Sequence, residues 1–482
     1  MQSKLDFYNQ LDQVDKPIVS IVGLGFVGVA MTAAVSLART NTGEHRYFVL
    51  GIDRDDEVGL SKIKAINRGI SPIISVDHSI QSAIHDAYID NSVLATADLN
   101  LIASSEIVVV DVNLDISLAD MSDPTSIKFD DYSFKELLIK IAENIQEECL
   151  VIIETTIPVG YTEHFIKPLF TNIFRDRSLD PNLIRLAHSY ERVMPGENYL
   201  RSITSYYRVY SAINEEAKRM TRDFLSSFID TESYPLTELK TTNDSEMAKL
   251  IENSYRATNI AFIQEWSELA GRAGVDLYEV LNSVRKRETH KNIMNPGFGV
   301  GGYCLTKDAI LAEWGSREFF ENHVTLACSM KAITINETMP DYSFRLMLEH
   351  SKHIASKKVG ILGVSYRPAV SDTRQSPARR FIDSCISSSI EVFLHDFLVT
   401  QWSEVNQPIV SRYTELSKDI NILLFSLGDE RYKSISPMEL KRTFPKLLLI
   451  IDASDAVNDE KAAEYRHLGI KTVGIGKGHW GC

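Results

Sequence analysis

The chain has 482 residues, of which 44% are hydrophobic and 24% charged, and it carries a formal net charge of −14. A chain of this length exceeds the size at which one hydrophobic core keeps growing, so we expect two or three domains, and the composition excludes a disordered or fibrous protein. The negative charge argues against a nucleic-acid partner and against an anionic membrane surface.

The N-terminal segment "MQSKLDFYNQLDQVDK" lacks the apolar core of a signal peptide, and no run approaches the roughly 18 apolar residues of a membrane helix. We therefore expect a cytoplasmic protein. The five cysteines are scattered and include no CxxC pair, which argues against a disulfide framework and a structural zinc site; they are Cys149, Cys304, Cys328, Cys385 and Cys482. A functional cysteine is therefore predicted to act as a thiol, and no metal is expected.

The first predicted unit is a strand, a glycine turn and a helix in "KPIVSIVGLGFVGVAMTAAVSLAR", where Gly23, Gly25 and Gly28 form a GxGxxG pattern. Such a turn holds a dinucleotide pyrophosphate over the first turn of the helix. A second strand, "YFVLGID", ends at Asp53, whose carboxylate can accept from ribose hydroxyls and favours NAD over NADP. The neighbouring Arg54 leaves NADP open, and a turn that serves only helix packing is the alternative.

Two further apolar runs, "EIVVVDV" and "ECLVIIETTIPVG", are separated by helical stretches, which is typical of a parallel sheet covered on both faces. From about Thr241, the segment "TTNDSEMAKLIENSYRATNIAFIQEWSELAGRAG" predicts one long helix that ends at Gly271 and Gly274. After Pro340, strands at "KVGILGV", "IEVFLHD", "NILLFSL" and "KLLLIID" predict a second α/β domain that lacks a full GxGxxG.

The predicted fold class is therefore α/β, with two Rossmann-like doubly wound domains joined by a long central helix and a helical middle domain. We place the boundaries at residues 1–205, 206–335 and 336–482.

The middle region contains "NPGFGVGGYCLTKD", residues 295–308, a glycine-rich stretch directly before Cys304. The glycines would give a substrate close access, and the amides of Gly301 and Gly302 are candidate donors to an oxyanion. Lys307 would favour the nucleophilic thiolate. A small buried cysteine is the alternative, but an inert core residue does not need these neighbours.

This loop resembles the active-site loop of the UDP-glucose/GDP-mannose dehydrogenase family, NAD-dependent enzymes that oxidise the C6 alcohol of a nucleotide sugar to a carboxylate. Five more segments resemble family motifs in the same order: "GLGFVG", "ETTIPVG", "YERVMPG", "EMAKLIENSYRA" and "YRPAVSDTRQSPA". The resemblance implies an NAD-binding first domain, a dimerising middle domain and a UDP-sugar-binding last domain. It also implies a twofold oxidation in which Cys304 forms a thiohemiacetal and then a thioester that water releases.

The resemblance assigns roles to single residues. Lys249 and Asn253 are four residues apart on the predicted helix and would stabilise the developing oxyanion at C6; a solvated pair is the alternative. Glu191 resembles the base for thioester hydrolysis, and Asp308 with Thr156 the pair that orders a catalytic water. The cofactor residues are Gly23, Gly25, Val27, Gly28, Asp53, Arg54, Lys307 and Arg374. The substrate residues are Phe298, Gly301, Arg367 and Arg287, of which Arg287 resembles an arginine that enters a neighbouring subunit's site.

Some features depart from the family pattern. "VVVDVNLD" stands where relatives have a TP-containing turn, so the loop near Val112 and Asn113 is expected to differ. "ERVMPG" is typical of enzymes for N-acetylated sugars, whereas "CLTKD" is more like the glucose type. The sugar therefore stays open among UDP-glucose, UDP-N-acetylhexosamines and a uronic or deoxy relative.

Two other functions stay open at this point. One is a two-electron dehydrogenase of the 6-phosphogluconate or 3-hydroxyacyl type, which needs no thiol, and the other is a non-catalytic regulator that senses dinucleotides. For an enzyme of this family we expect a homodimer or larger assembly, with the central helix at the interface.

Overall fold

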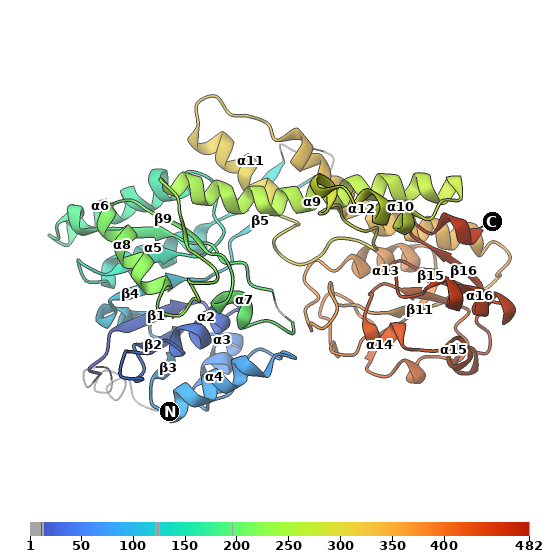
Figure 1. Ribbon diagram of the computed structural model, residues 1–482, viewed down its shortest axis with the longest axis horizontal. Helices are drawn as coiled ribbons and strands as arrows, with labels where there is room; N and C mark the ends of the chain where they lie inside the picture. The colour runs from blue at the N-terminus through green and yellow to red at the C-terminus, as the bar shows by residue number, and fades with distance from the viewer. Residues whose placement is uncertain (1–10, 12–13, 121–122, 124–125, 195, 482) are drawn as a thin grey trace. The chain divides into compact units, whose positions relative to one another are not determined.

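Two separate β-sheets organise the chain in the computed structural model, which describes residues 11, 14–120, 123, 126–194 and 196–481 (Figure 1). The N-terminal unit holds the described residues of 1–119, 125–251 and 310–325, and the C-terminal unit those of 120–124, 252–309 and 326–482. Cys482 and most of residues 1–16, the segment that lacks the apolar core of a signal peptide, lie outside the described residues. The boundaries at residues 205 and 335 stay a prediction.

The N-terminal unit is built on an eight-stranded sheet with the order β10-β9-β8-β7-β4-β1-β2-β3. The strands are β1 (Ile18–Val22), β2 (Phe48–Ile52), β3 (Val93–Thr96), β4 (Ile107–Val110), β7 (Leu150–Ile153), β8 (Arg185–His188), β9 (Val209–Ala212) and β10 (Thr237–Glu238). The strands with continuous apolar sequences are buried along their whole length, as expected for a sheet covered on both faces. The strand order reverses direction between β1 and β4, and ligands bind at such a switch point in open α/β sheets.

One pairing differs from the predicted parallel sheet, because β9 runs antiparallel to β8. It lies near one edge of the sheet, where mixed pairing is common in large α/β sheets. The helices of this unit are α2 (Phe26–Ser36), α3 (Glu57–Ile66), α4 (His78–Ile89), α5 (Tyr132–Asn144), α6 (Lys167–Asp176), α7 (Arg201–Thr204) and α8 (Glu215–Leu225). Short helical turns are η1 (Leu99–Ser104), η2 (Thr162–Ile166) and η3 (Pro181–Leu183).

A separate hairpin of β5 (Asp115–Leu118) and β6 (Ile127–Asp130) follows β4. It begins just after the segment in which the TP-containing turn is missing. The Thr155 hydroxyl donates to the carbonyl oxygens of Val110 (3.1 Å) and Val112 (2.9 Å) and so fixes the start of this loop to the segment after β7.

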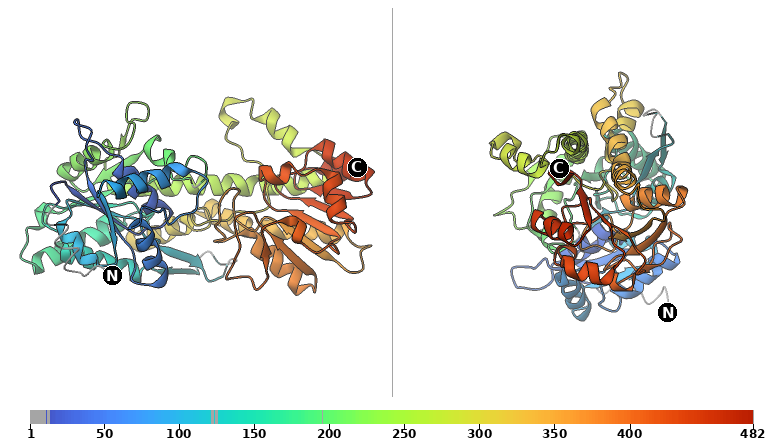
Figure 2. Two further views of the ribbon diagram at one scale, coloured as in Figure 1. Left: turned by 90° about the horizontal axis from the view of Figure 1, so that it is seen from below. Right: turned by 90° about the vertical axis from the view of Figure 1, so that its right-hand side faces the viewer.

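The long central helix is confirmed as α9 (Thr242–Ala273), a continuous helix of 32 residues (Figures 1 and 2). It ends at Gly274, whose φ of +68° suits a residue without a side chain. Gly271, predicted as part of the stop, lies inside the helix instead, where a Cβ would come within 2.5 Å of the Tyr342 hydroxyl. No helix in the described part of the chain is long and apolar enough to cross a membrane.

A six-stranded parallel sheet with the order β13-β12-β11-β14-β15-β16 forms the C-terminal unit. The strands are β11 (Lys358–Leu362), β12 (Glu391–His395), β13 (Ile409–Val410), β14 (Ile422–Phe425), β15 (Leu449–Asp452) and β16 (Lys471–Gly474). The helices are α10 (Leu277–Val284), α12 (Ala327–His350), α13 (Pro377–Ser387), α14 (Glu430–Lys433), α15 (Pro437–Thr443) and α16 (Asp459–His467). Helix α11 (Asp308–Phe319) starts in this unit, but from Ile310 on it belongs to the N-terminal unit. Short turns are η4 (Glu288–His290), η5 (Tyr413–Glu415) and η6 (Gly478–Gly481).

Alternate residues of these strands pack into two hydrophobic clusters, one with α12 and α13 and the other with α14, α15 and α16. The predicted second doubly wound domain is therefore confirmed. The sheet of this domain does not begin directly after Pro340, because this proline lies buried inside α12 and the first strand starts at Lys358.

Candidate functional site

The glycine turn lies at the carboxyl end of β1, beside the switch point of the first sheet. Gly23 has a φ of +101°, and a Cβ there would lie 2.4 Å from the Asp111 carbonyl oxygen. A Cβ on Gly28 would lie 1.8 Å from the Gly23 carbonyl oxygen. Both glycines are therefore required by backbone packing, as the GxGxxG pattern predicts.

Gly25 differs from the other two glycines, because a Cβ there would meet no atom of the described residues within 4 Å. It is the N-cap of α2, and as a glycine it has no side chain that could cap this helix. The first amides of α2 therefore start next to open space, which fits a pyrophosphate. Val27, the second residue of α2, is half-buried in this first helical turn.

Asp53, at the end of β2, is tied into the turn. Its carboxylate accepts from the amides of Leu24 (3.2 Å) and Arg54 (2.8 Å), and Lys62 Nζ lies 2.8 Å away. The Asp53 side chain is only 7% exposed, so its orientation is fixed before a ribose arrives. The Arg54 side chain is 75% exposed and pairs with Asp56. Lys62 was not predicted as a site residue, although it lies on α3, the first helix after this strand.

Glu191 and Lys249 form an ion pair in the N-terminal unit. Lys249 reaches from α9 to the Glu191 carbonyl oxygen (2.7 Å) and to one carboxylate oxygen (3.4 Å), and both side chains are largely buried. The Val193 amide also donates to this carboxylate. His188 at the end of β8 lies 2.6 Å from the Ser245 hydroxyl, and burial, with the charge of Lys249, lowers its pKa to about 3. This histidine is therefore neutral at physiological pH.

Two further acidic residues, Asp111 and Glu154, follow the neighbouring strands β4 and β7. Asp111 follows β4, and burial raises its pKa well above its ordinary value; Arg208 opposes this shift and Glu191 adds to it. Arg208 itself forms a buried ion pair with Glu154. Asp111 lies directly before Val112 and Asn113, where the TP-containing turn of the family is missing. Thr156 is half-buried two residues after Glu154.

Glu246 connects α9 to the segment "ETTIPVG". It accepts from the amides of Gly160 (2.7 Å) and Thr162 (3.1 Å) and is fully buried. Burial raises its pKa to about 8. Neither this residue nor Arg208 was singled out from the sequence, because their partners lie far away along the chain.

The glycines of the cysteine loop lie flat against the segment 366–377 of the same unit. A Cβ on Gly299 would lie 2.3 Å from Pro377 Cβ, and a Cβ on Gly301 would lie 2.6 Å from Tyr366 Cβ. These glycines were predicted to give a substrate close access. The structure adds that two of them are required by packing against the motif "YRPAVSDTRQSPA".

Gly302 has a φ of +79°, and its amide donates to the Arg374 carbonyl oxygen at 2.9 Å. The expectation that this amide donates to an oxyanion is therefore wrong, since the amide already has a partner. The hydrogen bond instead joins the cysteine loop to the predicted cofactor arginine.

Cys304 is exposed at the tip of the loop, and its carbonyl oxygen accepts from the amides of Lys307 (3.2 Å) and Asp308 (3.0 Å). The Asn253 amide group donates to the Asp308 carboxylate at 2.6 Å. Lys307 Nζ lies 3.6 Å from the same carboxylate and 4.5 Å from the centroid of the Tyr303 ring. The C-terminal unit thus brings three predicted site residues, Asn253, Lys307 and Asp308, close to Cys304.

Arg374 lies 5.6 Å from the centroid of the Tyr303 ring and pairs with Asp372 at 2.7 Å. Burial opposes its charge, but the ion pair, with smaller contributions from Tyr366 and Cys304, raises the pKa of Arg374. A permanent cation is therefore held near the thiol.

The remaining predicted substrate residues differ in their surroundings. The Phe298 ring is buried 5.9 Å from the Phe381 ring, so it anchors the loop. Arg367 and Arg287 are exposed. Arg285, which was not predicted, donates to the Ile293 carbonyl oxygen and fixes the segment that leads into the cysteine loop. The substrate roles of these residues stay predictions.

Comparison with known proteins covers most of the chain. The NAD binding domain, the central domain and the UDP binding domain of the UDP-glucose/GDP-mannose dehydrogenase family match residues 18–224, 243–338 and 360–459. A UDP-N-acetyl-D-mannosamine dehydrogenase of Methanocaldococcus jannaschii is 30% identical over 68% of this chain and 70% of its own length. Another from Methanococcus aeolicus is 26% identical over 95% of both chains. The solved UDP-D-ManNAc dehydrogenase of Pyrococcus horikoshii has a TM-score of 0.79 at 25% identity and covers 96% of this chain and 100% of its own.

Proposed function

The chain belongs to the UDP-glucose/GDP-mannose dehydrogenase family and has its NAD-binding domain, and on that basis we propose that it oxidises the C6 alcohol of a UDP-sugar twice, to the uronic acid. The observation that carries this proposal is an exposed thiol on a closely packed glycine loop, with the Asn253–Asp308 pair beside it. A two-electron dehydrogenase would not need such a loop.

Cys304 is the nucleophile in this proposal. The first oxidation yields an aldehyde at C6, which has no further hydride to lose until a group adds to it. Addition of the Cys304 thiolate gives a thiohemiacetal, loss of the second hydride gives a thioester, and water releases the acid and restores the thiol. Arg374 and Lys307 favour the thiolate through their positive charges.

The other catalytic residues act on protons and on charge at C6. Lys249 and Asn253, one turn apart on α9, stabilise the oxyanion that develops there. Glu191 takes the proton of the water that attacks the thioester, and Asp308 and Thr156 orient this water. The Glu191–Lys249 contact supports this assignment because it orients the base with a cation.

NAD accepts the two hydrides, one molecule for each oxidation. Gly25 and the first amides of α2 would hold its pyrophosphate, because the structure leaves open space only at this glycine of the turn. Asp53 would accept from the ribose hydroxyls, and its fixed carboxylate disfavours a 2′-phosphate. Val27, Arg54, Lys307 and Arg374 would complete the cofactor site.

For the sugar we propose a UDP-N-acetylhexosamine. The relatives named above are UDP-N-acetyl-D-mannosamine dehydrogenases, and the segment "ERVMPG" supports the same class. UDP-glucose is the second candidate, because "CLTKD" is of the glucose type. Gly301, Phe298, Arg367 and Arg287 would contribute to substrate binding through the loop and the C-terminal unit.

We also propose a homodimer that forms through α9. Large apolar side chains stay between 48% and 59% exposed along this helix: Met247, Ile251, Tyr255, Phe262, Trp266 and Leu269. An exposed apolar stripe of this length marks a protein interface. Light scattering of the wild type and of Trp266→Glu tests this, and a monomeric wild type would contradict it.

The function is tested by the ratio of NADH formed to sugar consumed, for a panel of UDP- and GDP-sugars. Two NADH per sugar, with an acid as product, is the expected result. Cys304→Ser should bind NAD normally but form no acid. One NADH per sugar would favour the two-electron dehydrogenase, and no turnover of any sugar would favour the regulator.

A further inference from the structure

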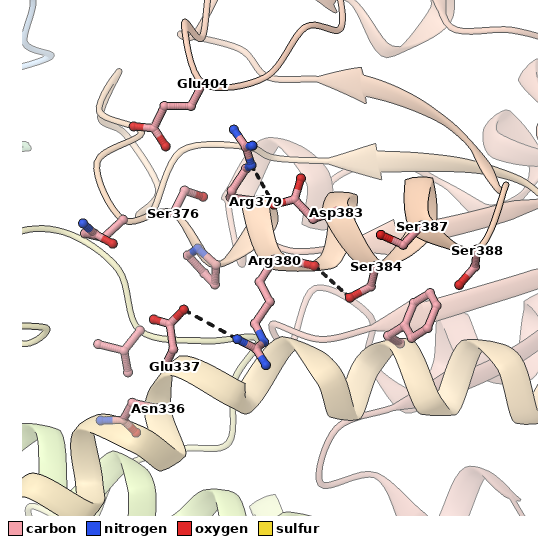
Figure 3. A pocket seen from close by; sticks show the side chains of 14 residues that line it. Asn336, Glu337, Ser376, Arg379, Arg380, Asp383, Ser384, Ser387, Ser388 and Glu404 are labelled. Atoms are coloured by element: carbon pink, nitrogen blue, oxygen red, sulfur yellow. Dashed lines mark hydrogen bonds and ion pairs between the residues drawn. The ribbon is translucent and has the colours of Figure 1, made fainter. Parts of the chain in front are cut away.

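A cavity of about 570 Å³ lies in the C-terminal unit between α12 and α13 (Figure 3). This volume is within the range of small-molecule sites in proteins. No residue assigned above to catalysis, cofactor or substrate lines it. One wall comes from α12 with Asn336, Glu337 and Phe344, and the opposite wall from α13.

Asn336 gives the first indication of the ligand. The side chain is only 4% exposed, and its amide group donates to the Ala257 carbonyl oxygen at 2.9 Å. This hydrogen bond identifies the nitrogen end of the side-chain amide. The oxygen end, Oδ1, has no hydrogen-bond partner in the described part of the chain. A buried acceptor without a partner is unfavourable, and a donor of a ligand that reaches this oxygen from the cavity would satisfy it.

The charges around the cavity disfavour an anionic ligand. They come from two guanidinium groups and four carboxylates: Arg379, Arg380, Glu337, Asp341, Asp383 and Glu404. Arg380 already binds Asp341 through two hydrogen bonds of 2.7 and 2.8 Å, and Figure 3 shows it next to Glu337. Arg379 binds Asp383 at 2.8 Å. The lining itself has one more carboxylate than guanidinium group, which disfavours ligands with phosphate or carboxylate groups, NAD and nucleotide sugars among them.

Hydroxyl groups and one aromatic ring also line the cavity. Ser384, Ser387 and Ser388 present hydroxyls from α13 and its C-cap, and Phe344 offers an apolar surface. The cavity therefore combines carboxylate, amide and hydroxyl acceptors with a single aromatic face. An uncharged molecule with many hydroxyl groups matches this set, because each hydroxyl both donates and accepts.

The cavity also touches the backbone that carries the catalytic loop. Val300 lines it from the cysteine loop, and Gln375, Ser376 and Pro377 line it from the segment on which Gly299 and Gly301 pack. An occupant therefore contacts both partners of this packing, four residues before the thiol of Cys304.

We propose that this cavity is a second binding site for an uncharged polyhydroxyl molecule of monosaccharide size, and that its occupant changes the exposure of Cys304 through the loop. The proposal does not depend on the proposed reaction. Its test reads binding and thiol reactivity without turnover.

Binding is measured on the full chain by saturation-transfer NMR with N-acetyl-D-glucosamine, D-glucose and spermidine as probes. Ser387→Trp fills the rim of the cavity at an exposed position, and Asn336→Leu removes the acceptor. Ile386→Trp is the matched control, because this neighbouring side chain is 50% exposed and does not line the cavity. We expect saturable binding of at least one sugar, weakened about tenfold or more by either cavity variant and unchanged in the control, as for loss of one hydrogen bond.

Coupling is measured as the rate of Cys304 alkylation by iodoacetamide with and without the bound sugar. Cys328, which is also exposed, is the internal reference. We expect at least a twofold change at Cys304, none at Cys328, and none at either thiol in Ser387→Trp. Absence of saturable sugar binding, binding of spermidine alone, equal loss in Ile386→Trp, or an unchanged Cys304 rate in the sugar complex would each overturn the proposal.

Discussion

Gly299→Ala tests whether the close packing of the cysteine loop positions the thiol. The new Cβ would lie 2.3 Å from Pro377 Cβ, whereas ordinary contacts begin at 3.4 Å, so the two atoms must separate by 3.4 − 2.3 = 1.1 Å. Pro377 is at the first turn of α13 and is held by a rigid ring, so the loop has to yield. A displacement of about 1 Å at a reacting group lowers the rate about 100-fold. The strain itself destabilises the unit by about 1–3 kcal/mol.

The matched control is Gly297→Ala, two residues earlier in the same loop, where a new Cβ meets nothing within 4 Å in the part of the chain that the structure describes. The assay is kcat/KM for NADH formation with the best nucleotide sugar, together with thermal unfolding and NAD affinity. We expect Gly299→Ala to lose about 100-fold in kcat/KM with unchanged NAD affinity, and Gly297→Ala to stay within a few-fold of wild type. Wild-type activity of Gly299→Ala, or an equal loss in the control, would show that the packing of Gly299 does not position the thiol.

Three further predictions concern the N-terminal unit. Asp53→Asn should weaken NAD binding about tenfold or more in a fluorescence titration, because a charged acceptor is lost. Lys62→Met keeps the carboxylate and should weaken NAD binding less. Equal losses in the two variants would contradict the role of the carboxylate. Glu246 stays protonated in the folded state up to its pKa of about 8, whereas the unfolded chain releases this proton at a lower pH. The free energy of unfolding therefore falls as pH rises, by about 2 kcal/mol between pH 6 and 8. Denaturant unfolding of Glu246→Gln should lack this part of the pH dependence, and an unchanged slope would argue against a buried proton. Lys249→Met should lower kcat about 100-fold or more with NAD affinity unchanged, as for loss of an oxyanion partner; a loss confined to KM would contradict that role.

The sequence alone predicts most of the fold because its signals are local. The apolar runs at 18–22 and 107–110 and the glycine turn between strand and helix each depend on neighbouring residues, and the structure has them where expected. The long helix from Thr242 follows from its own spacing of apolar residues. The antiparallel β9 and the helical setting of Pro340 were not predictable, since sheet pairing and tertiary packing override these local signals.

The site is predictable in its residue types but not in the reasons for them. The pattern around Cys304 indicates a reactive thiol, yet nothing near it in the sequence shows that Gly301 and Gly302 are packed against Tyr366. The occupied amide of Gly302 and the pairing of Lys62 with Asp53 likewise depend on side-chain positions in the fold. Contacts between distant segments have no signal in one sequence.

The central claim is that Cys304 forms a bond to the sugar carbon between two hydride transfers. The most direct measurement is the mass of the Cys304 peptide after acid quenching during turnover of the best UDP-sugar, with Glu191→Gln used to slow thioester hydrolysis. If the proposed mechanism holds, this peptide alone gains a mass equal to the nucleotide sugar bound as a thioester. An unmodified Cys304 peptide while two NADH per sugar are still formed would contradict it.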